Sequence, residues 1–157
     1  APKPSTAVMV MYVGLAIGDF GSGLLSQLLK SRKKVLLGFL TLAVAATVAY
    51  FTVGRSSLTV FYATVFVLGI ASGYWAVFVT VASEQFGTNL RSTATTTAPN
   101  FVRGAVVLVT SSFQVMKGGL GVVGSAVVVG VVVFALAFVS LLGLEETHGK
   151  DLDFLEE

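Results

Sequence analysis

The sequence contains no cysteine and only one histidine, His148, among its 157 residues. Without cysteine, the chain cannot form a disulfide bond, a thiolate nucleophile or a zinc site with cysteine ligands. The histidine lies in a charged C-terminal tail, which excludes a histidine-based metal cluster and a histidine-dependent catalytic triad. From these absences we expect no metal ion and no cofactor.

Charged residues are scarce as well. They make up 11% of the chain, whereas a soluble domain carries about a quarter. Hydrophobic residues make up 55%, and the mean hydropathy is +0.89. This composition excludes a soluble enzyme, a nucleic-acid-binding protein and a disordered chain. The stretches with no charge are 35–54, 56–83 and 118–144, and those with a single charge are 4–29 (Asp19) and 92–116 (Arg103).

Five stretches reach the length of about 20 apolar residues that a helix needs to cross about 30 Å of hydrocarbon. The rival interpretation, a membrane β-barrel, would show alternating segments of about ten residues, which this sequence lacks. We therefore predict an all-α polytopic membrane protein, treated as one domain over 1–157. Its transmembrane helices are expected at about 6–29, 35–53, 58–83, 92–115 and 121–144, followed by a tail at 145–157.

The positions of lysine and arginine predict the orientation, because these residues accumulate on the cytoplasmic side. Six lysine and arginine residues are predicted on one side of the membrane and three on the other. This places the 30–34 loop, the 84–91 loop and the C-terminus in the cytoplasm and the N-terminus outside. The expected location is a bacterial inner membrane or a plasma membrane. The six are Lys30, Arg32, Lys33, Lys34, Arg91 and Lys150, and the three are Lys3, Arg55 and Lys117.

Two charges fall near the middle of predicted helices. Asp19 is expected roughly 15 Å deep and Arg103 roughly 18 Å deep, at 1.5 Å per residue. Charges at such depth are costly and usually mark substrate or ion pathways. One hypothesis is that Arg103 binds an anionic group of a substrate and Asp19 titrates or pairs. The alternative is a buried structural ion pair between the two.

Polar residues accompany both charges. A stripe at helical spacing contains Thr96, Asn100, Arg103, Thr110 and Gln114, and a matching face contains Tyr12, Asp19, Ser22, Gly23 and Ser26. Pro99 removes one helical hydrogen bond, so it forms either a gating hinge or a harmless kink. Tyr74 and Trp75 lie inside the bilayer rather than at its surface. They either line a pocket for a ring-shaped or sugar substrate or fill a gap between helices. A run of small residues on the same predicted helix indicates a face for close helix packing.

Three cytoplasmic stretches resemble motifs of one family, the major facilitator superfamily of transporters. Residues 23–34 look like its loop motif between the second and third helices of each half. Glu84, six residues and Arg91 look like its Glu-x6-Arg element. Residues 144–150, Leu-Glu-Glu-Thr-His-Gly-Lys, are similar to the Pro-Glu-Thr-Lys-Gly motif after the twelfth helix of sugar porters and organic-ion carriers.

The resemblance departs from the family pattern at three positions. Gln27 replaces an acid, Lys30 replaces a glycine and Glu145 replaces a proline. In the family these motifs form a cytoplasmic gating network. The resemblance assigns that role to Arg32, Lys33, Glu84, Arg91 and Glu146. The alternative is that these residues only provide a cytoplasmic positive charge and solvated loops.

The order of the motifs matches helices 8 to 12 of a twelve-helix transporter, so the resemblance implies a partial fold of that kind. It implies alternating-access transport of a small polar organic solute, an organic anion or a sugar, with protons as a candidate coupling ion. The expected partners are the solute, the lipid bilayer, and missing N-terminal helices or a partner subunit, but no nucleic acid. The alternative is a non-transporting subunit or scaffold. An enzyme is not expected, since no nucleophile–base set is present.

Overall fold

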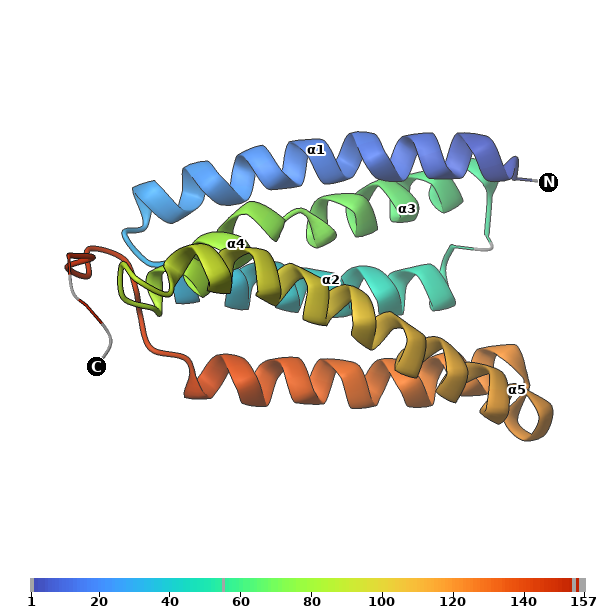
Figure 1. Ribbon diagram of the computed structural model, residues 1–157. Helices are drawn as coiled ribbons and strands as arrows, with labels where there is room; N and C mark the ends of the chain where they lie inside the picture. Colours follow the sequence, from blue (N-terminus) through green and yellow to red (C-terminus); the bar gives the residue numbers. More distant parts are fainter. Residues whose placement is uncertain (1, 55, 154, 156–157) are drawn as a thin grey trace. The chain divides into compact units, whose positions relative to one another are not determined.

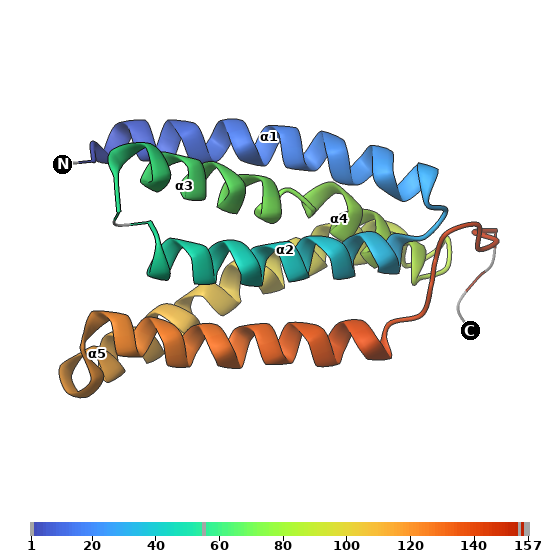
Figure 2. The ribbon, with the colours of Figure 1, turned by 180° about the vertical axis from the view of Figure 1, so that it is seen from behind.

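The computed structural model describes residues 2–54, 56–153 and 155. Within these residues the chain is helical and contains no strand, which confirms the all-α prediction (Figures 1 and 2). Arg55, which was counted for the orientation, lies outside the described residues, as do Phe154, Glu156 and Glu157 of the predicted tail. The helices are α1 (Pro4–Leu28), α2 (Arg32–Thr52), α3 (Leu58–Ser72), α4 (Trp75–Glu84) and α5 (Arg91–Gly143).

Four helical segments are long and apolar enough to cross a membrane: Pro4–Leu28, Arg32–Thr52, Leu58–Glu84 and Arg91–Gly143. Several long apolar helices are compatible with a membrane protein, as predicted. The expected count of five is not reproduced, because α5 continues through Lys117 and Gly119, where the sequence predicted a turn. A 53-residue helix would measure about 80 Å at 1.5 Å per residue, far more than the roughly 30 Å of a bilayer core.

The departure from helical geometry in α5 falls at Gly121 instead. Its dihedral angles are φ 70° and ψ 176°, in a region that is open to glycine but strained for other residues. Both views show the chain reversing direction at this end of α5 (Figures 1 and 2). We call residues 91–120 the first arm of α5 and residues 122–143 its second arm.

A second break lies where the sequence predicted one continuous helix over 58–83. The helix stops at Ser72 and restarts at Trp75. Gly73 has φ −82° and ψ 55°. Its N–H donates to the carbonyl oxygen of Ile70, three residues earlier, which makes a tighter turn than that of an α-helix. The prediction of an uninterrupted helix here is wrong, because this glycine leaves the helical conformation.

The chain forms two compact units, Ala1–Val81 with Glu145–Gly149, and Ala82–Leu144 with Lys150–Glu157. In the first unit, α3 packs on α1 and on α2. The buried apolar side chains of this unit come from α2, α3 and α4. They are Val35, Leu36, Phe39, Leu40, Ala46, Val65, Ala71, Val77 and Val81.

Glycines allow α1 and α3 to touch through their backbones. A Cβ atom on Gly14 would overlap the carbonyl oxygen of Phe66, and one on Gly69 would overlap that of Met11. One turn later, a Cβ on Gly73 would come within 2.5 Å of the Cα of Gly18. Small residues at a helix crossing provide this close approach in membranes, where tight packing replaces the hydrophobic effect as the force that joins helices.

The second unit is built mainly from α5, and its apolar side chains are largely exposed. Phe101 is 76% exposed, Leu108 72% and Val115 82%. Only 6% of the most apolar window of α5 is buried within the chain. A water-soluble surface rarely carries so much contiguous apolar area, so this helix requires lipid or other protein around it.

The α1–α3 contact makes a stability prediction. Gly14→Ala inserts a methyl group against the backbone of α3, and overpacking of this kind costs about 1–3 kcal/mol. We expect a correspondingly lower free energy of unfolding in detergent, measured by circular dichroism during denaturant titration. Gly21→Ala is the matched control, since nothing lies within 4 Å of its added Cβ. An equal loss in both variants would contradict the proposed packing.

Candidate functional site

Glu146 lies at the N-terminus of α2, although it is far away in sequence. Its carboxylate accepts hydrogen bonds from the hydroxyl of Ser31 and from the backbone N–H groups of Arg32 (2.8 Å) and Lys33 (3.3 Å). It also accepts from the N–H groups of Thr147 and His148, each at 3.1 Å. The first N–H groups of a helix have no partner within it, so a carboxylate is well placed there.

These hydrogen bonds change the acidity of the carboxyl group. Partial burial raises the pKa of Glu146, but the Ser31 hydroxyl and the N–H groups of His148, Arg32 and Lys33 together lower it from 4.5 to about 2. The carboxylate is thus ionised at physiological pH. We call residues 145–149 the C-terminal strap, because they follow α5 in the sequence and are hydrogen-bonded to the start of α2. Thr147 within it is only 1% exposed.

The other residues assigned to the gating network divide between the two units. The Arg32 guanidinium donates to the hydroxyl of Ser26 at 2.6 Å, within the first unit. Glu84 and Arg91 belong to the second unit. There Arg91 donates to the carbonyl oxygen of Leu152 at 2.5 Å, and Glu84 is 9% exposed. Glu146 therefore meets Arg32 and Lys33 through their backbone N–H groups, an arrangement that the pattern of charges alone does not predict.

The strap predicts a pH dependence of stability. Because the pKa of Glu146 is about 2 in the fold and 4.5 ordinarily, its stabilisation is complete above about pH 4.5 and is lost as pH falls towards 2. We expect Glu146→Gln to unfold at a lower temperature than the parent protein at neutral pH. This difference should shrink between pH 4.5 and 2, as followed by thermal denaturation. Asp153→Asn is the matched control, and a gap that persists at pH 2 would contradict this role.

Asp19 lies beside the break between α3 and α4. Gly18 packs directly on Gly73, and the Asp19 carboxylate accepts a hydrogen bond of 3.4 Å from the N–H of Ala76, in the first turn of α4. Tyr74 is half-buried in the break and Trp75 is 37% exposed. The sequence placed these residues at mid-depth but did not predict the break that brings them together.

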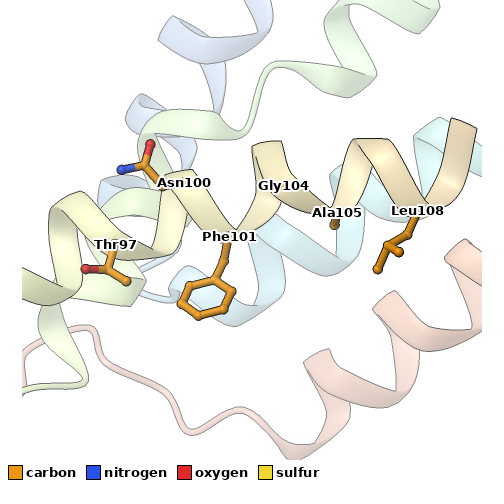
Figure 3. Close-up of a pocket in the computed structure, with 6 residues that line it drawn as sticks. All are labelled: Thr97, Asn100, Phe101, Gly104, Ala105 and Leu108. Carbon is orange, nitrogen blue, oxygen red and sulfur yellow. The ribbon is translucent and has the colours of Figure 1, made fainter.

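The predicted polar stripe lies on the first arm of α5. The Arg103 guanidinium donates to the side-chain oxygen of Asn100 at 3.2 Å, and both side chains are exposed, as is Gln114. Asn100 also lines a shallow, open hollow of about 470 Å³ on this arm, shown in Figure 3. The other residues that line it are Thr97, Phe101, Gly104, Ala105 and Leu108.

Other predicted residues are placed as follows. Tyr12 is 66% exposed on α1, away from the buried face that carries Ser22 and Ser26. Pro99 lies inside α5, where helical dihedral angles continue, and the non-helical position is Gly121. The hinge at Pro99 stays a prediction. So does the ion pair between Asp19 and Arg103, since each makes its hydrogen bond within its own unit.

Two signals in the sequence pointed to the missed contacts. Ser31 before an apolar run is a typical N-terminal helix cap, and it does accept from the N–H of Lys34. The pair Gly73-Tyr74 lies in a run of small residues, which predicted a packing face but not a break. Among the described residues, no group of histidine, cysteine or acidic side chains is arranged to hold a metal ion.

Comparisons with protein-family models, with curated proteins and with solved structures found no match to this chain. The resemblance to the major facilitator superfamily therefore stays a prediction from the motifs. The residues whose contacts bear on function are Arg103, Asp19 and those of the strap.

Proposed function

We propose that the chain is the C-terminal membrane part of a secondary transporter for a small organic solute, with an organic anion as the leading class and a sugar as the second. The observation that carries this proposal is Arg103. Its guanidinium is hydrogen-bonded to Asn100, which lines an open hollow, and it is the single charge in the stretch 92–116. A charge in that setting is costly unless it meets a counter-charge, a ligand or water.

The hollow has the mixed character of a site for small organic molecules. Thr97 and Asn100 provide polar groups, while Phe101 and Leu108 provide apolar surface. Such sites are mostly apolar, with a few polar groups that fix the orientation of the ligand. A carboxylate at the guanidinium and an apolar body against Phe101 would use both parts. The planar guanidinium of arginine can donate two parallel hydrogen bonds to a carboxylate, whereas the ammonium group of lysine acts as a point charge. The proposal therefore requires an arginine at position 103 and not only a positive charge.

The break between α3 and α4 supports the same proposal. Substrate and ion sites of secondary transporters are typically formed where a membrane helix is interrupted near the midplane. Here the interruption at Gly73 lies against Asp19. Asp19 is accordingly proposed to act in substrate or proton coupling within the first unit, together with Tyr12, Tyr74 and Trp75. Gln114 is proposed to act in substrate binding on the arm that carries Arg103.

The cytoplasmic motifs give a further argument. Lys30 stands where the family has a glycine, and its φ of 48° lies in the left-handed region that favours glycine. It follows the last turn of α1, where such a residue commonly ends a helix. The backbone at Lys30 thus has a conformation that glycine adopts more readily than lysine. We propose that Arg32, Lys33, Glu84, Arg91 and Glu146 act in gating, and that Pro99 acts as a hinge.

Transport predicts a specific dependence on Arg103. In liposomes containing the protein, uptake of labelled benzoate, a small aromatic carboxylate, should fall at least tenfold in Arg103→Ala, as one bidentate carboxylate contact contributes about 1.5–3 kcal/mol. Arg103→Lys should retain only part of the uptake. Lys117→Gln is the matched control, because it removes a cation of the same arm away from the hollow.

Three outcomes would decide against the proposal or part of it. Equal uptake by the parent protein and Arg103→Ala would remove Arg103 from the site. Glucose uptake without benzoate uptake would shift the solute to a sugar. Absence of any flux, together with stoichiometric co-purification of another membrane protein, would favour the alternative of a non-transporting subunit or scaffold. The missing transporter helices, or a partner subunit that supplies them, are part of the proposal.

The proposed topology has five crossings of a cell membrane, with the two arms of α5 crossing separately. This requires the 30–34 loop and the reversal near Gly121 to lie on opposite sides. Because the chain has no cysteine, single-cysteine variants give an unambiguous test. Lys34→Cys should react with an impermeant maleimide only from the cytoplasm and Lys117→Cys only from outside. Labelling of both from one side would contradict five crossings and this orientation.

A further inference from the structure

We propose that Asp19 and the break between α3 and α4 form a charge-controlled hinge inside the membrane-spanning region. In its ionised form, the Asp19 carboxylate holds the first turn of α4 against α1. When Asp19 is neutralised by a proton, this turn is released and α4 reorients about Gly73 and Tyr74. The inference concerns a conformational device of the fold, and its test does not require that any solute be transported.

The geometry separates a fixed part from a movable part. On one side of the break, α1 and α3 are in backbone contact at Gly14, Gly18 and Gly69, where no side chain can yield. These two helices therefore behave as one rigid pair. On the other side, α4 begins afresh at Trp75, with its first intrahelical hydrogen bond from Phe78 to the carbonyl of Tyr74.

The hydrogen bond from Ala76 to Asp19 connects the two parts. The N–H groups of the first helical turn lack intrahelical acceptors, and in hydrocarbon no water replaces them. An external carboxylate satisfies one of these groups and carries the negative charge that a helix N-terminus favours. Asp19 is directed to this turn because its neighbour Gly18 is packed on Gly73.

Few titratable or charged side chains besides Asp19 lie on α1 to α4 or at the break. The other titratable or charged side chains on the helices packed around Asp19 are Tyr12 (α1), Tyr62 (α3), Tyr74 at the break, Glu84 (α4), and Arg32, Lys33, Lys34 and Tyr50 (α2). Arg32, Lys33 and Lys34 belong to the first turn of α2, where the strap is bound. Of the whole group, Tyr74 alone belongs to the break.

The chain contains its own reporter for this hinge. Trp75 is the only tryptophan and is the first residue of α4, 37% exposed, with its ring 5.3 Å from that of Phe78. A change in the position of the first turn of α4 alters the environment of this indole. Its emission wavelength and its quenching by acrylamide therefore follow the hinge directly, without any label.

The test is a pH titration of Trp75 fluorescence in the intact protein in lipid nanodiscs, from about pH 8 to about pH 3. We expect one transition in the parent protein. Asp19→Asn should show no transition and should have the emission of the low-pH form at every pH. Asparagine keeps a hydrogen-bond acceptor but not the charge, so it isolates the charge.

Control variants identify the titrating group. Asp151→Asn, in the tail, should retain the parental transition, and His148→Gln should remove any contribution of the single histidine. Asp19→Glu should keep a transition with a shifted midpoint. Glu146 stays ionised through nearly all of this range, because its pKa is about 2.

Three results would overturn the proposal. One is a parent protein whose Trp75 emission does not change with pH, a measurement that needs no variant. Another is an Asp19→Asn variant that retains the parental transition. The third is an Asp19→Asn variant fixed at the high-pH emission, which would show that the hydrogen bond holds α4 without the charge. Loss of benzoate uptake alone bears on Arg103 and leaves the hinge untouched.

Discussion

The structure depends on the requirement that backbone N–H and C=O groups find partners in the absence of water. Long helices satisfy nearly all of them internally, which is the reason a chain with so few charges can remain in hydrocarbon. The groups left over are the ends of helices, and two acidic side chains of this protein accept hydrogen bonds from such ends. Glu146 accepts from the first turn of α2, and Asp19 accepts from the first turn of α4.

The helical character of the chain, with its long apolar segments, could be predicted from the sequence, because apolar runs between charged clusters have few other solutions in a bilayer. The two irregular positions were predicted less well, for the same reason in each case. Gly73 interrupts a stretch, 58–83, that has no charged residue or proline to mark the interruption, and Gly121 bends the chain just beyond the Lys117-Gly118-Gly119 sequence that had suggested a turn. Local propensity identifies residues that permit a break, but the contacts of neighbouring helices decide which of them is used.

The sequence predicted which residues belong to the candidate site better than it predicted the contacts that these residues make. The charges of Asp19 and Arg103 are conspicuous in an apolar sequence, and Asn100 lies one helical turn from Arg103, so their hydrogen bond follows from spacing. The bond from Ala76 to Asp19 could not be predicted, since it exists only where α3 has already been interrupted. Likewise, the motifs grouped Glu146 with Arg32 and Lys33 in one network but did not predict that its carboxylate accepts hydrogen bonds from their backbone N–H groups.

The strap also sets an order of assembly. The hydroxyl of Ser31 and the carboxylate of Glu146 are 115 residues apart in sequence, so the start of α2 obtains this cap only after all of α5 has left the ribosome. Until then α1, α2 and α3 must rely on their glycine contacts and apolar packing alone. Closing so long a loop costs little more entropy than closing one of half the length. Residues translated after α5 thus complete a unit that was begun with α1, and synthesis interrupted before them leaves the start of α2 without this cap.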